Sequence, residues 1–558
     1  MLRPSVDREL AALVGVKVEE ARRTAFLLMG AVIGLGVAVA GFGVLSRQFF
    51  LMVGGLAIAP LAVVFLFYPV FEIRSKIGRV EGELLPAALF ATIYASAERD
   101  MAEGFYAVEP GVAPHMAEFI KNVERMRIKR LIATPHEALG EAARLLEGSK
   151  ISGVLMAMST ARAVGLSQYL QARDVLKSVL FELRSAYARL AENVKLIGEI
   201  ILVFFGVLPL MMLIINSIFY SAGAAVQLLA YVFLVIPAIG VALAYLIDSA
   251  YPKTPESFLK KYRLYLIGAG IGAGIAVAAS TALAASPLQI KISAAGSGYA
   301  GAVKGAYALA VGIAAGALAA GAFVAPKYLL DARRRWGIIS ALPYFVRDLA
   351  ESVKTGFAPA RAVAVLIQKK SYNKYFDEVL KSMARRIAKG ATFRDAAVEE
   401  AREVPWIAGI VLAAAGEAER LGAKHEIFAD LADAVRDVVD ILKAARSAMW
   451  GAVMFGLITV VIITVLLGGV AKSLIFQVAD QATSLQAAAA QMPGGIQLIT
   501  WPQVPEVLRY ALIGAVLNAV VLGILIGKMA EGNFYASSLY LTISAAIALV
   551  SVFVSIFI

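Results

Sequence analysis

Nine long apolar runs limit what this chain can fold into more than any other feature of its sequence. Each run holds roughly eighteen or more residues with almost no charge, enough helix to cross the hydrocarbon core of a membrane. Lipid offers no hydrogen-bond partners, so a spanning segment must satisfy its own backbone, as a helix does. The runs are residues 25–45, 49–71, 197–219, 224–247, 264–285, 303–324, 448–469, 507–526 and 539–558. The sequence therefore predicts an all-α, polytopic membrane protein with about nine transmembrane helices.

The distribution of charge predicts how these helices are oriented. Hydrophobic residues make up 60% of the chain and charged residues 17%, and the net charge is +12. Lys and Arg concentrate in every second segment between the spans, starting with the one before the first span. Segments rich in Lys and Arg lie on the cytoplasmic side of a membrane. The basic residues of these segments are Arg22, Arg23, Arg74, Lys76, Arg79, Lys253, Lys260, Lys261, Arg263, Lys327, Arg333, Arg334 and Arg335. We therefore expect a cytoplasmic amino terminus, a carboxy terminus outside, and no nucleic-acid partner behind the positive charge.

Two less apolar blocks, each over a hundred residues long, share landmarks in the same order, and each runs into apolar spans. The paired landmarks are Leu85-Pro86 with Leu342-Pro343, residues 133–138 with 391–396, Gly153 with Gly409, and Gly165 with Gly422. Similarity at a fixed spacing indicates a structural repeat. Charge placement puts both blocks in the cytoplasm.

Both blocks have the pattern of helical bundles. In the second, apolar residues from Leu342 to Val353 recur every three or four positions, the spacing of one buried helix face. A short helix over 360–368 and another over 375–389 follow. Thr134 and Thr392 are each expected to cap the next helix with their hydroxyl.

The first glycine after each Leu-Pro pair does not keep the same spacing. Gly104 follows Pro86 by 18 residues, whereas Gly356 follows Pro343 by 13. An insertion in the first block around residues 96–101 would explain the difference, and so would a chance match of the two glycines.

These features predict five regions. Residues 1–71 hold an amino-terminal amphipathic helix and two spans, residues 72–196 the first block, residues 197–325 four spans, residues 326–447 the second block, and residues 448–558 three spans. An external loop over 470–506 is expected to be partly helical, with Trp501 anchored at the membrane interface.

Catalysis and transport find little support in the residues. There is no cysteine, and His115, His136 and His425 show no metal-ligand spacing. We therefore expect no catalytic, cofactor or metal site, and no enzyme. A lipid-modifying enzyme lacks an acid, base or metal cluster. A transporter or channel of unknown substrate remains the alternative, although the spans have essentially no ionisable residue at their centres.

Basic residues crowd one segment of each block and could face an acidic partner or anionic lipid heads. They are Lys121, Arg125, Arg127, Lys129 and Arg130 in the first block, and Lys369, Lys370, Lys381, Arg385, Arg386 and Lys389 in the second.

The arrangement resembles the type II secretion F-domain family. That family includes the platform proteins of type II secretion and type IV pili, the Tad platforms and the archaeal J-type platforms of archaella and pili. The resemblance rests on the two Leu-Pro openings, Gly356-Phe357, residues 391–393, Leu421-Gly422, and each block's passage through a long helix into a span. Two blocks with nine spans are more similar to the archaeal members than to the shorter bacterial ones.

The resemblance implies a non-enzymatic platform in the cell membrane with two cytoplasmic F-type helical bundles. Its implied partners are a hexameric cytoplasmic ATPase, pilin-like subunits, membrane lipids and a second copy of the chain, as a dimer. The basic residues above are then expected to face the ATPase. Pilus, archaellum and secretion pseudopilus all remain open.

Overall fold

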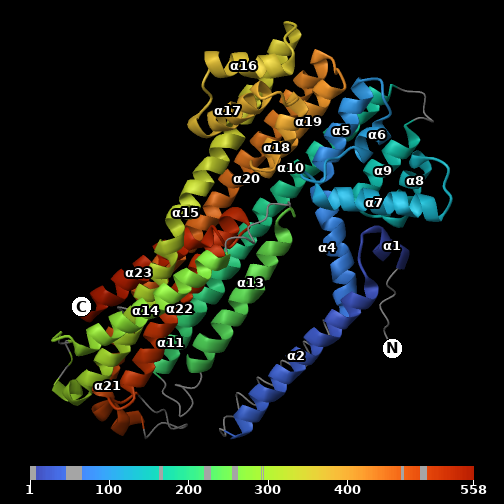
Figure 1. Cartoon of the computed structure of the whole chain (residues 1–558). Helices are drawn as coiled ribbons and strands as arrows, with labels where there is room; N and C mark the ends of the chain where they lie inside the picture. The colour runs from blue at the N-terminus through green and yellow to red at the C-terminus, as the bar shows by residue number, and fades with distance from the viewer. Residues whose placement is uncertain are drawn as a thin grey trace. The chain divides into compact units, whose positions relative to one another are not determined.

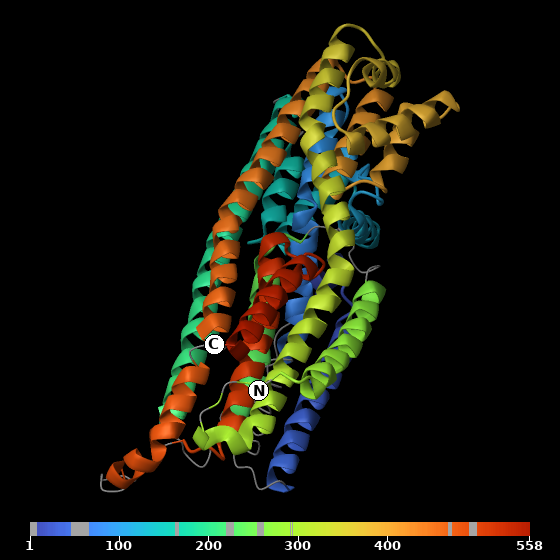
Figure 2. The same cartoon turned by 90° about the vertical axis from the view of Figure 1, so that its left-hand side faces the viewer.

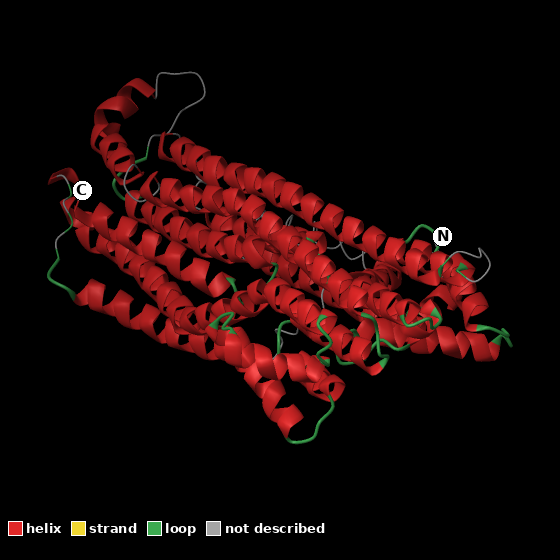
Figure 3. Ribbon diagram, turned by 90° about the horizontal axis from the view of Figure 1, so that it is seen from above, coloured by secondary structure: helices red, strands yellow, loops and turns green. Residues whose placement is uncertain are grey.

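The computed structural model describes residues 8–45, 66–161, 167–218, 228–253, 262–288, 290, 292, 294–466, 471–489 and 499–557. Regular structure in these residues is entirely helical, as predicted (Figure 3). The helices in chain order are α1 (Arg8–Leu13), α2 (Val18–Leu45), α4 (Tyr68–Gly82), α5 (Leu84–Ser96), α6 (Met101–Tyr106), α7 (Pro114–Lys129), α8 (Pro135–Leu145), α9 (Lys150–Thr160), α10 (Gln168–Ile201), η2 (Leu202–Val207), α11 (Leu208–Ile218), η3 (Tyr231–Val235), α13 (Ile236–Ala250), α14 (Tyr262–Ala285), η5 (Ala294–Tyr299), α15 (Ala300–Lys354), α16 (Pro359–Lys369), α17 (Lys374–Ala388), α18 (Phe393–Ala401), α19 (Trp406–Arg420), α20 (His425–Val465), α21 (Ala471–Ala489), α22 (Val504–Glu531) and α23 (Ser537–Phe557) (Figure 1).

Seven stretches of helix in the described residues are long and apolar enough to cross a membrane, and the protein is a membrane protein. They are Gln168–Met212, Leu228–Ala250, Arg263–Ala285, Gly296–Lys354, His425–Val465, Val504–Glu531 and Ser537–Phe557. These seven coincide with the third to ninth runs of the sequence. The first run lies in α2, and most of the second lies outside the described residues, so the count of nine stays a prediction.

The chain forms two compact units. Unit 1 comprises residues 1–184, 252–256 and 335–439, and unit 2 comprises residues 185–251, 257–334 and 440–558. Unit 1 therefore contains most of both predicted blocks. Three helices, α10, α15 and α20, contribute residues to both units, and Figure 2 shows α15 and α20 as continuous helices.

Unit 1 contains two series of six helices with matching ends. The first runs from α5 to α10 and the second from the end of α15 to α20. The threonine caps are confirmed: Thr134 Oγ1 accepts a hydrogen bond from the Glu137 amide at 3.2 Å, and Thr392 Oγ1 from the Asp395 amide at 3.0 Å. Helices α16 and α17 begin and end within one residue of their predicted limits.

The match of Gly104 with Gly356 is wrong. Gly356 ends α15 in a left-handed conformation at φ +90°, and the residue in that role after α5 is Glu98, at φ +59°. The Phe357 amide bonds to the Ser352 carbonyl, and the Arg99 amide bonds to the Tyr94 carbonyl in the same way. Gly104 instead lies inside α6, where a Cβ would sit 2.5 Å from the Phe90 carbonyl oxygen. The two helix ends therefore match to within one residue, and the first block needs no insertion.

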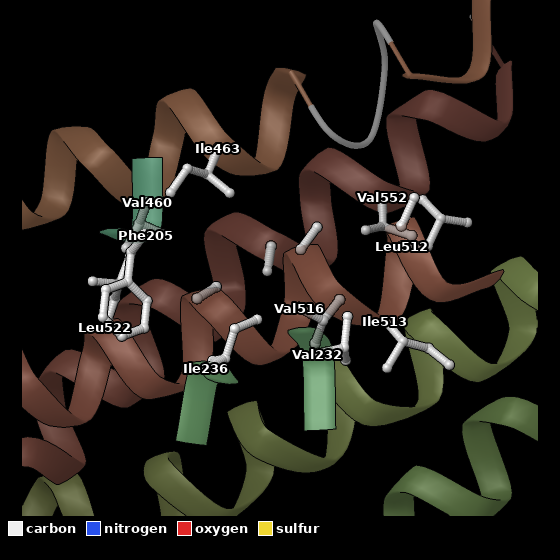
Figure 4. Packing of buried hydrophobic residues seen from close by; sticks show 14 of the residues in the cluster. Phe205, Val232, Ile236, Val460, Ile463, Leu512, Ile513, Val516, Leu522 and Val552 are labelled. Carbon is white, nitrogen blue, oxygen red and sulfur yellow. The ribbon is translucent and has the colours of Figure 1, made fainter. Parts of the chain in front are cut away.

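Unit 2 has an apolar core built around α22. Side chains of α22 pack against η3, α13, α20 and α23 (Figure 4). The labelled members of this cluster are Phe205, Val232, Ile236, Val460, Ile463, Leu512, Ile513, Val516, Leu522 and Val552. A helix that is apolar on every side is suited to such a central position.

The predicted external loop folds onto this core in its described part. It contains α21, and Lys472 on that helix donates to the carbonyl of Ser555 at 3.0 Å, in the last turn of α23. Trp501 is 7% exposed, and its Nε1 donates to Asp480 Oδ1 at 3.0 Å. The expectation of an interfacial anchor is therefore wrong, because the indole packs inside the protein.

Helix α14 contacts α15 through small residues. A Cβ on Gly272 would lie 2.6 Å from the Gly316 carbonyl oxygen, whereas a Cβ on Gly270 would meet nothing within 4 Å. Small residues allow two helix backbones to approach closely in lipid.

We expect Gly272→Val to lower the melting temperature of the purified protein by several degrees, because overpacking costs about 1–3 kcal/mol. Gly270→Val is the matched control on the same helix and should leave the melting temperature unchanged. Equal effects of the two substitutions would contradict the close approach of α14 and α15.

Candidate functional site

Helices α7 and α17 occupy the same place in their series and share one register. Ala113 and Asn373 precede their first residues. Buried residues then follow at identical intervals: Met116, Phe119, Ile120 and Val123 in α7, and Phe376, Val379, Leu380 and Met383 in α17. The opposite, exposed faces of the two helices carry most of the basic residues singled out in the sequence.

Four of the eleven predicted basic residues are bound to carboxylates of the chain itself. Arg127 contacts Glu124, and Arg130 contacts Glu9 and Glu141. Lys370 Nζ lies 2.6 Å from Asp348 Oδ2, and Arg386 contacts Glu399, Glu400 and Glu403. Arg130, Lys370 and Arg386 link helices within unit 1, whereas Arg127 pairs with Glu124 inside α7, and all four are only partly free for a partner.

The other seven have no carboxylate partner in the part of the chain that the structure describes, and all seven are exposed. They are Lys121, Arg125, Lys129, Lys369, Lys381, Arg385 and Lys389. Arg125 donates to the side chain of Asn122, and Arg385 to the backbone of Lys381. We call Lys121, Arg125 and Lys129 the α7 stripe, and Lys381, Arg385 and Lys389 the α17 stripe.

A buried polar joint connects the two series, and the sequence analysis missed it. Glu417 of α19 is 3% exposed, and its Oε1 accepts a hydrogen bond from the Tyr94 hydroxyl of α5 at 2.8 Å. Its Oε2 accepts from Arg394 Nε at 2.9 Å, and Arg420 Nη2 lies 2.5 Å from Oε1. Arg394 also donates to Glu109 at 2.7 Å. One carboxylate thus gathers a tyrosine of the first series and two arginines of the second.

Apolar packing surrounds this joint. In α5 every residue from Leu84 to Ala95 is buried, and in α19 every residue from Ala408 to Ala418. The two helices pack directly against each other. At the edge of the contact, Trp406 Nε1 donates to the Val112 carbonyl at 2.8 Å. A short helix that is apolar on all sides was the available sequence signal, because such a helix must be covered all round.

The electrostatics of the joint favour an ionised Glu417. Burial by itself would raise the pKa of this carboxyl, but hydrogen bonds from Arg420, Tyr94 and Arg394 hold the pKa below its usual value. The pKa of the Tyr94 hydroxyl rises to about 12, because the group is buried and donates to the carboxylate. The hydroxyl therefore keeps its proton at neutral pH.

A second buried carboxyl lies between α4 and α5. Glu83 is fully buried, and its Oε2 accepts from the Met116 amide at 2.7 Å. Its Oε1 has no hydrogen-bond partner in the described residues. Burial raises the pKa of Glu83 to about 7, against the opposing effect of the backbone hydrogen bonds.

The three histidines lie apart, in α7, α8 and α20. Within the described residues, no group of three or more His, Cys, Asp or Glu side chains is placed to hold a metal ion. His136 is more enclosed than a surface histidine: Nε2 lies 2.7 Å from Asp100 Oδ2, and Nδ1 lies 3.0 Å from the Met158 carbonyl.

Comparison with known proteins finds a match for the second series. Residues 345–471 match the family model of the type II secretion system (T2SS), protein F. This part of the chain is therefore similar to that family. The matched residues run from the end of α15 through α20 and include the α17 stripe, Glu417 and Arg394. No curated protein and no solved structure matches the chain.

The family match confirms the resemblance stated for the second block. It does not extend to residues 72–196, so the assignment of the first block as an F-type bundle stays a prediction. We refer to residues 345–471 as the F domain.

Replacing Glu417 by Gln should destabilise unit 1 by about 3 kcal/mol, because two arginines lose their counter-charge in a buried site. Tyr94→Phe should cost about 1 kcal/mol, since one hydroxyl is lost. Thermal unfolding of the purified full chain measures both. Glu399→Gln, which removes an exposed partner of Arg386, is the matched control and should have little effect. Additive effects of E417Q and Y94F would contradict a shared joint.

Glu83 should make the stability of the chain fall as the pH rises. A carboxyl whose pKa is raised in the folded state stabilises most below its unfolded pKa of about 4.5, and the stabilisation is lost as the pH rises to about 7. Unfolding of Glu83→Gln and wild-type protein between pH 5 and pH 8 tests this expectation. Identical pH profiles for the two proteins would contradict it.

Proposed function

We propose that this protein is a membrane platform of a type IV pilus-like assembly machine. It would couple a cytoplasmic secretion ATPase to the insertion of pilin-like subunits into a filament. The observation that carries the proposal is the F domain, whose last helix, α20, continues from unit 1 into a candidate membrane span. Proteins of the T2SS protein F family generally work with secretion ATPases in the membrane.

The seven exposed basic residues are the surface we assign to the ATPase. Complementary charge speeds encounter and selects partners, and it acts best where the cations are not already paired. The cations of both stripes have no carboxylate partner in the described residues. Lys and Arg near the span ends support a cytoplasmic location for both blocks.

We also propose that the protein is not an enzyme and that the ATPase supplies the energy. The position of one charged pair in unit 2 argues against the alternative of a transporter. Lys528 and Asp248 lie 3.2 Å apart near the ends of α22 and α13, away from the middle of those helices. Transporters usually place ionisable groups at the membrane midplane.

Reversing the charges of the two stripes should abolish filaments without reducing the amount of the protein in the membrane. We expect this of the sixfold variant K121E/R125E/K129E/K381E/R385E/K389E in the native cell, because an acidic surface would repel an acidic partner. Filaments counted by electron microscopy, with immunoblotting of membranes, measure the outcome. The control for charge reversal elsewhere changes three exposed basic residues outside the stripes, R144E/K177E/K374E, and should leave the filaments normal. Normal filaments in the sixfold variant would remove the stripes from the proposal.

A further inference from the structure

The two stripes occupy the same positions on two equivalent helices. Lys121 follows Ala113 by eight residues, and Lys381 follows Asn373 by eight. The second and third members follow at steps of four in both helices, a rise of about 6 Å per step along an α-helix. An exposed glutamate stands three residues before each stripe, Glu118 in α7 and Glu378 in α17. At these four positions the two helices therefore carry the same charges.

The inner faces of these helices differ where the outer faces agree. Phe119 corresponds to Val379, and Val123 to Met383, so the packing residues have been exchanged for others of different shape. A face that served only solubility could carry charges of either sign at any spacing. Retention of the same charge at three positions indicates that both faces meet the same kind of surface.

A protein surface fits this repetition better than a lipid surface. Anionic lipid attracts any basic cluster and needs no fixed spacing, and stable attachment adds apolar insertion. The α7 stripe has exposed apolar neighbours, Ile128 at 62% and Leu131 at 91% exposure, whereas Ala388 and Gly390 flank the last residue of the α17 stripe. What the stripes share is therefore the spacing of their charges.

We propose that the stripes are two copies of one docking surface, bound at the same time by two subunits of an oligomeric partner that repeats one acidic face. This inference rests on the proposed function, in which the partner is a hexameric ATPase. Both stripes lie in one compact unit, and the joint around Glu417 ties the two helical series together. A fixed separation lets the second contact form at high effective concentration once the first has formed.

The test uses the full chain in nanodiscs of neutral lipid and the purified secretion ATPase from the same cells. K121E/R125E/K129E and K381E/R385E/K389E should each weaken binding of the hexamer by a similar factor, on the order of 100-fold, because avidity is lost. The sixfold variant should not bind detectably. Towards an ATPase variant held as a monomer, the two threefold variants should bind nearly as well as the wild type, because only one stripe is used at a time.

Matched controls separate the stripes from a general loss of charge or of fold. R144E/K177E/K374E changes charge by the same amount and should bind the hexamer like the wild type. Replacing the three residues of each stripe by glutamine should weaken binding of the hexamer in the same order as the glutamate variants, but less strongly. All variants should have the wild-type melting temperature.

Two results would overturn the inference while leaving the proposed function intact. In the first, one stripe carries all the binding and the other none. In the second, the stripe variants bind the hexamer normally but lose binding to vesicles containing phosphatidylserine, which would identify the stripes as a lipid surface. Failure of the wild-type chain to bind the ATPase at all would instead overturn the proposed function.

Discussion

Unit 1 depends on the contact between two helices that are apolar on every side, α5 and α19. Neither can face water along its length, so each must be covered by its own series and by the other. Apolar packing alone would tolerate sliding of one helix along the other. Glu417 removes that freedom, because in this register its two oxygens reach Tyr94 of α5 as well as Arg394 and Arg420. The buried carboxylate thus specifies how the two series pair, and the apolar residues supply the stability.

Local chemistry was readable from the sequence, and contacts between distant residues were not. The spans follow from apolar length, and the caps at Thr134 and Thr392 follow from a hydroxyl three residues before a partner amide. Tyr94 and Glu417 are 323 residues apart, and nothing in the local sequence around either one identifies the other. The error at Gly104 has a related cause. The first glycine after Pro86 was matched to Gly356, but the left-handed helix end in the first series is at Glu98, a residue other than glycine.

The basic surface shows the same limit. The sequence predicted eleven exposed cations, but which of them are free depends on carboxylates contributed by other helices. Arg130 is held by Glu9 of α1 and Glu141 of α8, so a residue within the charged run has a structural role. Lys129 beside it has no carboxylate partner in the described residues. Tertiary contacts therefore turn a broad charged region into two narrow stripes with a shared spacing.

On the proposed function, continuous helices would give these stripes a means of acting on the membrane. Helices α10, α15 and α20 each contribute residues to both units without an intervening loop. A helix backbone is stiffened by a hydrogen bond at every residue, whereas a loop absorbs displacement by rotation about φ and ψ. The Glu417 joint is linked to two of these helices, because α19 leads into α20 after four residues and the Thr92 hydroxyl of α5 donates to the Ala172 carbonyl of α10 at 3.2 Å. On the proposed function, a displacement applied at α17 would be shared by both series and would reach the spans along hydrogen-bonded backbone, whereas a flexible connection would absorb it.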